Sequence, residues 1–450
     1  MTIWTHELLD ALRQIGDPAL DPVDGKGGWR DVKVLPAEKG LEGEPEQKLL
    51  LTWRKSLTGA MPDAAVAYKD PFWTAVDASM DPDQLEIAYG LFAVYGGEIA
   101  ASLLLASLPN AYAAEAGAAV LNTTQQLSSN TRRRIAETAQ MVVDVMFPDT
   151  TRLYSPAALK EVPNVPSLLP GGRGYVRARS TRLTHAIIRE VITSKSPWDP
   201  MATARVPARP QTLRGIAINQ EDLLGTLGTF TVTTFEAMEK LGVPWNDEAE
   251  AAYLAHWGRV GELLGIGSSE VTDNLLAQGF DLPPEYHGAL RPKTPEDARG
   301  LQRMIRERCW PVPLRDRVLG PFTNRNGKIL TRALLDELQA GMPRGMERLP
   351  QVVMRYLVHD TAHELLGLGG GGVPDSILRW PTQKSFVRTP GRRPGKVAIE
   401  RTMRLAASEV SRRAFLYFIR SRAADDGQAN FWFPIAPEER MVILEGRGSP

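Results

Sequence analysis

One histidine with two arginines at helical spacing is the first arrangement in this sequence that could do chemistry. His185 lies within the stretch Arg182-Leu-Thr-His185-Ala-Ile-Ile-Arg189. In a helix, residues three and four apart share a face, so both guanidiniums lie beside the imidazole among small and aliphatic side chains. An iron porphyrin needs a nitrogen ligand, a flat apolar surface and cations for its propionates. The face suits such a cofactor, although a lone helical histidine is more often a hydrogen-bonded packing residue.

A second arrangement is the stretch His359-Asp-Thr-Ala-His363-Glu364. On a helix, two imidazoles four residues apart can bind one metal ion. The stretch resembles the zinc-protease signature His-Glu-x-x-His, but Asp360 stands where that signature has its general-base glutamate. One interpretation is a mononuclear metal hydrolase at His359 and His363. The other, favoured by the lack of a third ligand downstream, is a scaffold helix with histidines near its C-terminal end.

Three polar residues accompany an apolar helical stripe further upstream. The segment from Thr131 to Val145 predicts an amphipathic helix. Arg134, Glu137 and Thr138 fall on one side of it, at positions i, i+3 and i+4. They either mark the edge of the protein surface or orient a ligand in an otherwise apolar pocket. The stripe itself consists of Ile135, Thr138, Met141, Val142 and Val145.

The elements that must position these residues are helices. From about residue 80 to about residue 423, apolar residues recur three and four apart. The clearest segment begins after Asn246, which can cap a helix, and ends at Gly265. Pro- and Gly-rich connectors are predicted at about 159–174, 195–212, 280–296 and 369–396. We expect an all-α protein with three parts: an irregular N-terminal leader packed on the core (1–80), a central domain (80–370), and a C-terminal connector and helix (371–450).

Composition limits the partners and the compartment. The 53 basic and 53 acidic residues leave no net positive field for nucleic acid. The single cysteine, Cys309, excludes an internal disulfide and a multi-cysteine metal site. The N-terminal residues show no secretion signal, so we expect a cytoplasmic protein. The apolar stretch Tyr89–Leu108 contains Glu98, which costs about 3 kcal/mol at the centre of a membrane, so we expect a buried core helix and no transmembrane span.

At these segments the sequence resembles the rubber oxygenase catalytic-domain family, which includes the bacterial latex clearing proteins and the fungal MpaB oxygenase. The resemblance covers about residues 80 to 370, in the order that the family has. The matching stretches are Thr131-x-x-Arg134-x-x-Glu137-Thr138-Ala-Gln, Gly174-Tyr-Val-Arg177-Ala-Arg-Ser-Thr-Arg182-Leu-Thr-His185-Ala-x-x-Arg189, Ile218-Asn-Gln-Glu-Asp222-Leu-Leu-Gly-Thr226-Leu and Tyr356-Leu-Val-His-Asp360-x-x-x-Glu364-Leu-Leu-Gly367-Leu.

The resemblance implies a globin-like helical core that holds one haem b, with His185 as the iron ligand. It also implies that Arg134 and Thr138 lie on the distal side of the haem. The sequence departs from the family at Glu137, where latex clearing proteins have a lysine that can occupy the distal iron position. Their catalytic-base glutamate is matched most nearly by Glu115.

We therefore expect a haem b-dependent oxygenase that uses dioxygen to cleave a carbon–carbon double bond in an isoprenoid or another apolar alkene. Rubber itself is not the expected substrate, because polyisoprene particles must be attacked outside the cell. Two alternatives stay open. One is a haem sensor or carrier that has lost catalysis through the change at Glu137, and the other is the metal hydrolase at His359 and His363.

Overall fold

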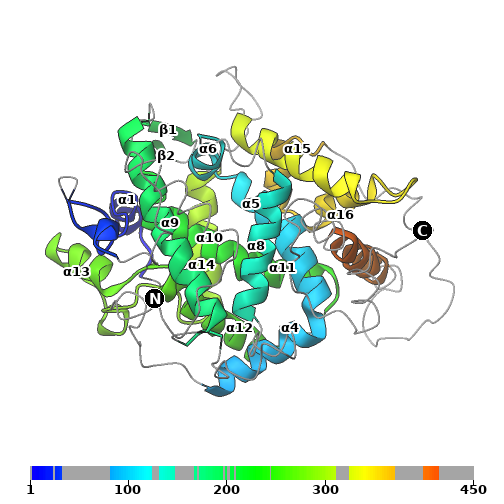
Figure 1. The fold of residues 1–450 in the computed structure, drawn as a ribbon, viewed down its shortest axis with the longest axis horizontal. Coiled ribbons are helices and arrows are strands. Elements are labelled where there is room, and N and C mark those ends of the chain that lie inside the picture. Colours follow the sequence, from blue (N-terminus) through cyan, green and yellow to red (C-terminus); the bar gives the residue numbers. More distant parts are fainter. Residues whose placement is uncertain are drawn as a thin grey trace, which may run out of the picture.

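The computed structural model describes residues 3–23, 26–32, 82–123, 131–146, 167–169, 172–195, 198–199, 203–206, 209–243, 245–310, 324–369 and 399–414. Within these ranges the protein consists of helices and one small hairpin (Figure 1). The expectation of a helical fold is confirmed.

Most of the helices contribute buried residues to one hydrophobic core. The η1 and η5 elements are 3₁₀ turns, and η2 is a π-helix. A last helix covers 399–414. In chain order the elements are α1 (His6–Leu12), η1 (Gly28–Arg30), α4 (Pro82–Ser102), η2 (Leu103–Ser107), α5 (Leu108–Tyr112), α6 (Glu115–Thr123), α8 (Thr131–Met146), α9 (Arg173–Lys195), β1 (Thr203–Val206), β2 (Arg209–Leu213), α10 (Gln220–Phe230), α11 (Val232–Lys240), α12 (Asp247–Leu263), α13 (Ser269–Ala277), η5 (Pro284–Tyr286), α14 (Pro295–Cys309), α15 (Arg325–Ala340), α16 (Leu349–Leu357) and α17 (Asp360–Leu366).

The hairpin is a departure from the sequence-based prediction. Strands β1 and β2 pair antiparallel, with Thr203 opposite Leu213, in a region where we expected only a connector. Thr203 and Val206 are β-branched, which suits an extended backbone. Pro210 is tolerated because each strand of a two-stranded sheet has a free edge. Two strands alone form no layer, so the hairpin does not change the fold class.

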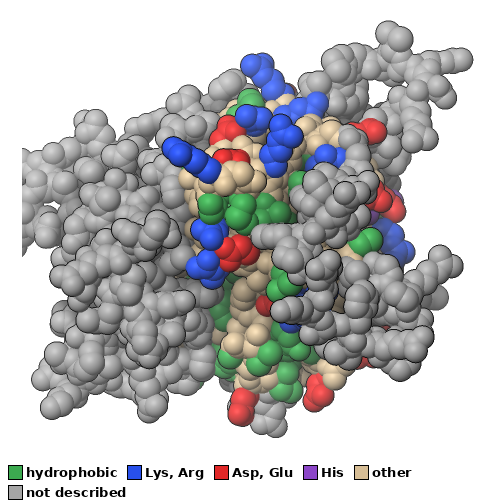
Figure 2. Space-filling model, turned by 90° about the vertical axis from the view of Figure 1, so that its right-hand side faces the viewer, with side chains coloured by type: hydrophobic (Ala, Val, Ile, Leu, Met, Phe, Trp, Pro, Cys, Tyr) green, Lys and Arg blue, Asp and Glu red, His purple; other side chains and the backbone are tan. Residues whose placement is uncertain are grey.

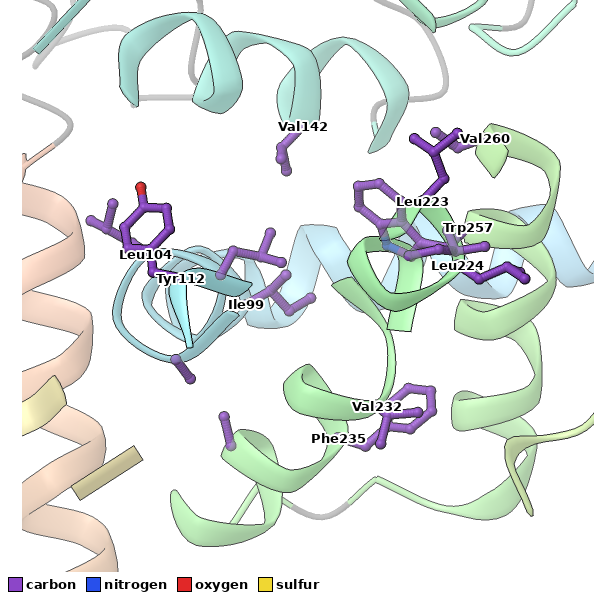
Figure 3. Packing of buried hydrophobic residues seen from close by; sticks show 14 of the residues in the cluster. Ile99, Leu104, Tyr112, Val142, Leu223, Leu224, Val232, Phe235, Trp257 and Val260 are labelled. Atoms are coloured by element: carbon purple, nitrogen blue, oxygen red, sulfur yellow. The ribbon is translucent and has the colours of Figure 1, made fainter. Parts of the chain in front are cut away.

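Helix α12 forms as its sequence predicts. The side chain of Asn246 accepts a hydrogen bond from the backbone N–H of Ala249 at 2.8 Å, and Gly265 follows the helix with a φ of 76°. Its apolar stripe is buried, with Trp257 1% exposed. Figure 3 shows Trp257 of α12, Ile99 of α4 and Val142 of α8 in the same packed region. The core is therefore built between helices that lie far apart in the sequence.

The apolar stretch of α4, η2 and α5 forms a helical run from Gln84 to Tyr112, with a kink at Tyr95, where φ is −116° and ψ is 19°. By length and composition this run could cross a membrane, which by itself is weak evidence for a span. In its most apolar window, 56% is buried inside the protein, as expected for a core helix. Glu98, the acid in the middle of the run, accepts a hydrogen bond from Arg404 of the helix at 399–414 at 2.8 Å. On the face that carries this last helix, basic, acidic and hydrophobic side chains lie close together (Figure 2).

The described part of the N-terminal segment packs on the core. Helix α1 begins after Thr5, whose hydroxyl accepts from the N–H of Leu8 at 3.2 Å. Leu8, Leu9 and Leu12 are all buried. The rest of the expected leader lies largely outside the described residues, and the boundaries near 80 and 370 stay predictions.

Four consecutive polar residues, Asn219–Asp222, form a buried cluster at the start of α10. Asn219 caps the helix by accepting from the N–H of Asp222 at 2.9 Å. The amide of Gln220 donates to the carbonyls of Gly16 and Gly265. These contacts connect the N-terminal segment and the end of α12 to the start of α10.

Glu221 is the charged centre of the Asn219–Asp222 cluster. It is completely buried and forms ion pairs with Arg13 of the N-terminal segment and, at 2.7 Å, with Arg308 of α14. Arg308 also binds Asp10 of α1 at 2.6 Å. Glu221 thus bridges two buried guanidiniums from different parts of the chain, and Asp222 and Asp10 each supply one of them with a second carboxylate.

We predict that Glu221→Gln lowers the free energy of unfolding by about 3 kcal/mol, because it removes the one fully buried carboxylate that Arg13 and Arg308 share and leaves them only Asp222 and Asp10 as counter-charges. Urea unfolding followed by circular dichroism measures the effect. The matched control is Glu250→Gln, since Glu250 pairs with Arg299, whose side chain is 42% exposed. That control should cost less than about 1 kcal/mol. Equal losses in the two variants would contradict the structural role of Glu221.

His256 of α12 is a buried histidine without polar support. It is 1% exposed, and its ring lies edge-on to Tyr89 at 5.3 Å between centroids. Neither ring nitrogen has a well-formed hydrogen bond among the described residues. Burial lowers the pKa of His256 from its ordinary value of 6.5 to about 4, and the nearby backbone of Val145 opposes this only in part. The ring is therefore neutral in the folded protein at pH 7.

This lowered pKa predicts an acid-sensitive contribution to stability. Between pH 6.5 and about 4, the unfolded chain binds a proton at His256 that the folded chain does not bind. The free energy of unfolding should therefore fall with pH through this window, by about 3 kcal/mol. His256→Leu should stay within about 1 kcal/mol of wild type at pH 7, because no hydrogen bond is lost. Urea unfolding at pH 7 and pH 4.5 should show a smaller acid loss for the variant; an unchanged loss would contradict the assignment.

Candidate active site

An apolar cavity of about 660 Å³ lies between the α4–η2–α5 run, α8 and α10. Part of this volume is open to solvent. No charged side chain of the described residues lines it. The lining consists of Ala100, Leu103, Leu104, Ser107, Leu108, Ala111, Ile135, Thr138, Ala139, Val142, Thr226, Thr229, Phe230 and Ala414.

Three of the cavity's four hydroxyl groups are used by the backbone. Ser107 donates to the carbonyl of Thr229 at 2.6 Å, and Thr229 donates to the carbonyl of Thr226 at 2.7 Å. Thr226 in turn donates to the carbonyl of Asp222 at 2.8 Å. These groups therefore offer little to a ligand, and the cavity suits an uncharged, apolar molecule.

The π-helix η2 forms part of the cavity wall. All five of its residues, Leu103–Ser107, are buried, and Leu103, Leu104 and Ser107 face the cavity. Single π-helical turns inside α-helices occur frequently at functional sites. Sequence reasoning missed this wall, because helical periodicity does not distinguish a lining residue from a packing residue. Of the lining residues outside α8, Thr226 of α10 had a signal, since it belongs to one of the motifs that resemble the oxygenase family.

Helix α8 supplies the predicted stripe to the cavity. Ile135, Thr138 and Val142 all line it, whereas Val145 is buried elsewhere in the core. Arg134 and Glu137 belong to α8, but their side chains lie outside the described residues. Of the three predicted site residues on this helix, Thr138 is the one whose side chain the structure describes, and it lines the cavity.

Helices α8 and α9 pack against each other at one end. A side chain at Gly174 would clash with the backbone of Asp144 and Val145, so glycine permits the close approach. Arg177 of α9 then binds Asp144 of α8, with 3.0 Å between Nε and Oδ2. The two helices that carry the predicted site residues are therefore direct neighbours.

His185 lies in the middle of α9 and is half-buried. It is not among the residues that line the 660 Å³ cavity. His185 and Thr138 therefore do not line this cavity together, although their helices touch. Glu115, the nearest match to the family's catalytic base, also lies away from the cavity and faces Arg214 at 3.5 Å.

Both arginines beside His185 have carboxylate partners in the N-terminal segment. Arg182 binds Asp17 through Nε at 2.6 Å and Nη2 at 2.8 Å. The Nε of Arg189 lies 2.9 Å from both carboxylate oxygens of Asp21. We expected these guanidiniums to be available for haem propionates, and the observed contacts do not support that role. The partners come from a distant part of the chain and could not be read from local spacing.

The pair His359 and His363 does not form the predicted helical metal pair. His359 is the N-cap of α17, where its Nδ1 accepts from the N–H of Thr361 at 3.3 Å. Its ring lies edge-on to Trp310, at 5.4 Å between centroids. Among the described residues, no group of three or more His, Cys, Asp or Glu side chains could hold a metal ion. The metal-hydrolase alternative therefore has no structural support in that part of the chain.

Comparison with known proteins agrees with this arrangement of helices. The family model described as "ER-bound oxygenase mpaB/B'/Rubber oxygenase, catalytic domain" matches residues 88–388. Among solved structures, the chain is similar to "Structure of Latex Clearing Protein LCP in the closed state", with a TM-score of 0.52 and 18% identity. That alignment covers 90% of this chain and 95% of the other, and it shows a shared fold. No curated protein matches. Since the family model spans more than half of the 450 residues, this chain belongs to the mpaB and rubber oxygenase catalytic-domain family.

Proposed function

We propose that this protein is a haem b-dependent oxygenase that cleaves a carbon–carbon double bond of an apolar alkene, such as an isoprenoid, with dioxygen. The observation that carries the proposal is the uncharged 660 Å³ cavity, which is walled by α8 in a chain of an oxygenase family. A cytoplasmic location is part of the same proposal.

The surroundings of His185 suit an axial ligand. Ala178 and Ile192, which lie two turns before and two turns after His185 on the same stripe of α9, are both buried, so this stripe faces the protein interior. On one side of this stripe Arg177 binds α8, and on the other Arg182 binds the N-terminal segment. When bound, haem would supply the oxygen chemistry, and the protein would supply the ligand and the apolar surroundings.

The cavity residues would bind and orient the alkene. An alkene has no charge to anchor it, so its affinity comes from apolar burial at roughly 25 cal/mol per Å². The same lining excludes water from the reacting double bond. Thr138 is the cavity hydroxyl on α8, and we assign it the hydrogen bond that orients dioxygen.

Arg134 and Glu137 complete the proposed catalytic set on α8. Both belong to the same helix as Thr138, four residues and one residue before it. A carboxylate at position 137 cannot act as the neutral nitrogen ligand that the family lysine provides. With haem bound, Glu137 would therefore offer a carboxylate where the family lysine offers an amine.

The first test of the proposal is the loss of haem from His185→Ala. The purified wild type should be coloured and bind one b-type haem per chain, and the variant should lose most of it because the axial bond is removed. His359→Ala and His363→Ala are matched controls and should keep their haem. Absorption spectra and haem extraction at equal protein concentration give the measurement. A His185→Ala variant with full haem would disprove the ligand assignment.

The second test fills the cavity. Ala139→Trp places a large side chain in the lining and should lower alkene turnover at least about tenfold while haem content is unchanged. Ala255→Trp, at an exposed position of α12, is the matched control. Neutral long-chain isoprenoids should react better than short ones, and prenyl diphosphates should not bind, because burying their charge is costly.

The products decide between oxygenase and carrier. Under isotopically labelled dioxygen, the wild type should yield aldehyde or ketone fragments that carry the label. If the haem-loaded wild type consumes no oxygen with any alkene, the oxygenase proposal is wrong and the protein is a haem sensor or carrier.

A further inference from the structure

We propose that Asp17 and Asp21 are positioning residues for His185: they hold α9 at one rotation about its axis and so set the direction of the imidazole. This inference rests on the proposed function, in which His185 is the haem ligand. The N-terminal segment would then help to position the iron ligand, although it lies more than 160 residues before His185 in the sequence.

Two ion pairs join this segment to α9, one at Arg182, about one turn before His185, and one at Arg189, about one turn after it. The Asp17–Arg182 pair is bidentate and buried on both sides, with side chains 4% and 8% exposed. The Asp21–Arg189 pair is reinforced by a hydrogen bond of 2.9 Å from Arg189 Nη1 to the carbonyl of Ile218. Bidentate pairs between a guanidinium and a carboxylate are directional as well as strong, so they fix orientation.

The two aspartates act as one unit. The backbone N–H of Asp17 donates to Oδ2 of Asp21 at 2.8 Å, so each holds the other in place. Glycine makes room for both pairs. A side chain at Gly16 would clash with Asp21 and Arg189, and one at Gly265, where φ is 76°, would clash with Arg182.

Ile218 shows that the contact with Arg189 is built into the fold. Among the described residues other than glycine, it alone has a positive φ, of 54°. A β-branched residue reaches this region only with strain, which the surrounding structure must compensate. The strained backbone directs its carbonyl to Arg189, and the Asn219–Asp222 cluster follows directly in the chain.

The other side of α9 is fixed by Arg177, which binds Asp144 of α8 at 3.0 Å. At about 100° per residue, His185 lies on the stripe between Arg177 and the pair Arg182 and Arg189. The helix is therefore held from both sides of the imidazole. A metal ligand needs to be held within about 0.5 Å of its productive position, and small rotations of a helix exceed that at the end of a side chain.

The test compares Asp17→Asn/Asp21→Asn with Asp10→Asn, using the full-length protein loaded with haem. Asp10 is the matched control, because it is an aspartate of the same segment that binds an arginine away from α9. Transfer of haem to excess apomyoglobin should be about tenfold faster in the double variant, as expected when support of a metal ligand is lost. Its electron paramagnetic resonance spectrum should also broaden or split. Asp10→Asn should match wild type in both measurements.

Each outcome decides between the proposals. Asp17→Glu/Asp21→Glu should recover part of the wild-type rate, since it restores the charges. If the double variant does not fold, Asp21→Asn alone carries the comparison, because that carboxylate is 30% exposed. Equal haem transfer and equal spectra for the folded aspartate variant and Asp10→Asn would overturn the positioning role only. A wild type that binds no haem would overturn the proposed function itself, and this inference with it.

Discussion

The burial of charge in the Asn219–Asp222 cluster is the interaction on which the rest of the described structure depends. A carboxylate without exposure to water is tolerated only where cations and hydrogen bonds compensate it. Arg13 and Arg308 meet that need for Glu221, and Gln220 uses its amide to join two loops. Because these buried groups must pair with one another, the N-terminal segment, α10, α14 and the end of α12 pack together.

The cluster reaches the candidate site in two directions. Helix α10 begins at the cluster, and its last turns wall the apolar cavity through Thr226, Thr229 and Phe230. The N-terminal segment, held by Arg13 and by Gly16, continues to the two aspartates that bind α9. One polar network thus orders both an uncharged cavity and the helix that carries His185.

The division between polar scaffold and apolar cavity agrees with membership of an oxygenase family. Apolar substrates require a site in which no buried polar group is left without a partner. The hydroxyls of Ser107, Thr226 and Thr229 satisfy this condition by donating to backbone carbonyls. The opposite wall is formed by the π-helix η2 and by α5, which contains Pro109. The irregular part of this helical run therefore lies where a ligand would be held.

The sequence by itself determined the helices and the family. The cap at Asn246 and the stripe through Trp257 are local patterns, so α12 could be predicted with its start and its buried face. The ordered motifs around Thr138 and His185 indicated the oxygenase family because each motif sits within one helix. Helix caps, apolar stripes and motifs all depend on residues that are close together in the sequence, so they can be recognised without the structure.

Only the tertiary structure decided what the side chains meet. The partners of Arg182 and Arg189 lie 165 and 168 residues away in sequence, and no spacing rule reaches so far. The cavity walls likewise come from helices that meet only after packing. The spacing of His359 and His363 had placed both inside one helix. In the structure the backbone of His359 is extended, so the residue caps α17, which begins at Asp360. Helix formation is governed by local contacts, whereas ion pairing and cavities depend on which distant surfaces the burial of apolar groups brings together.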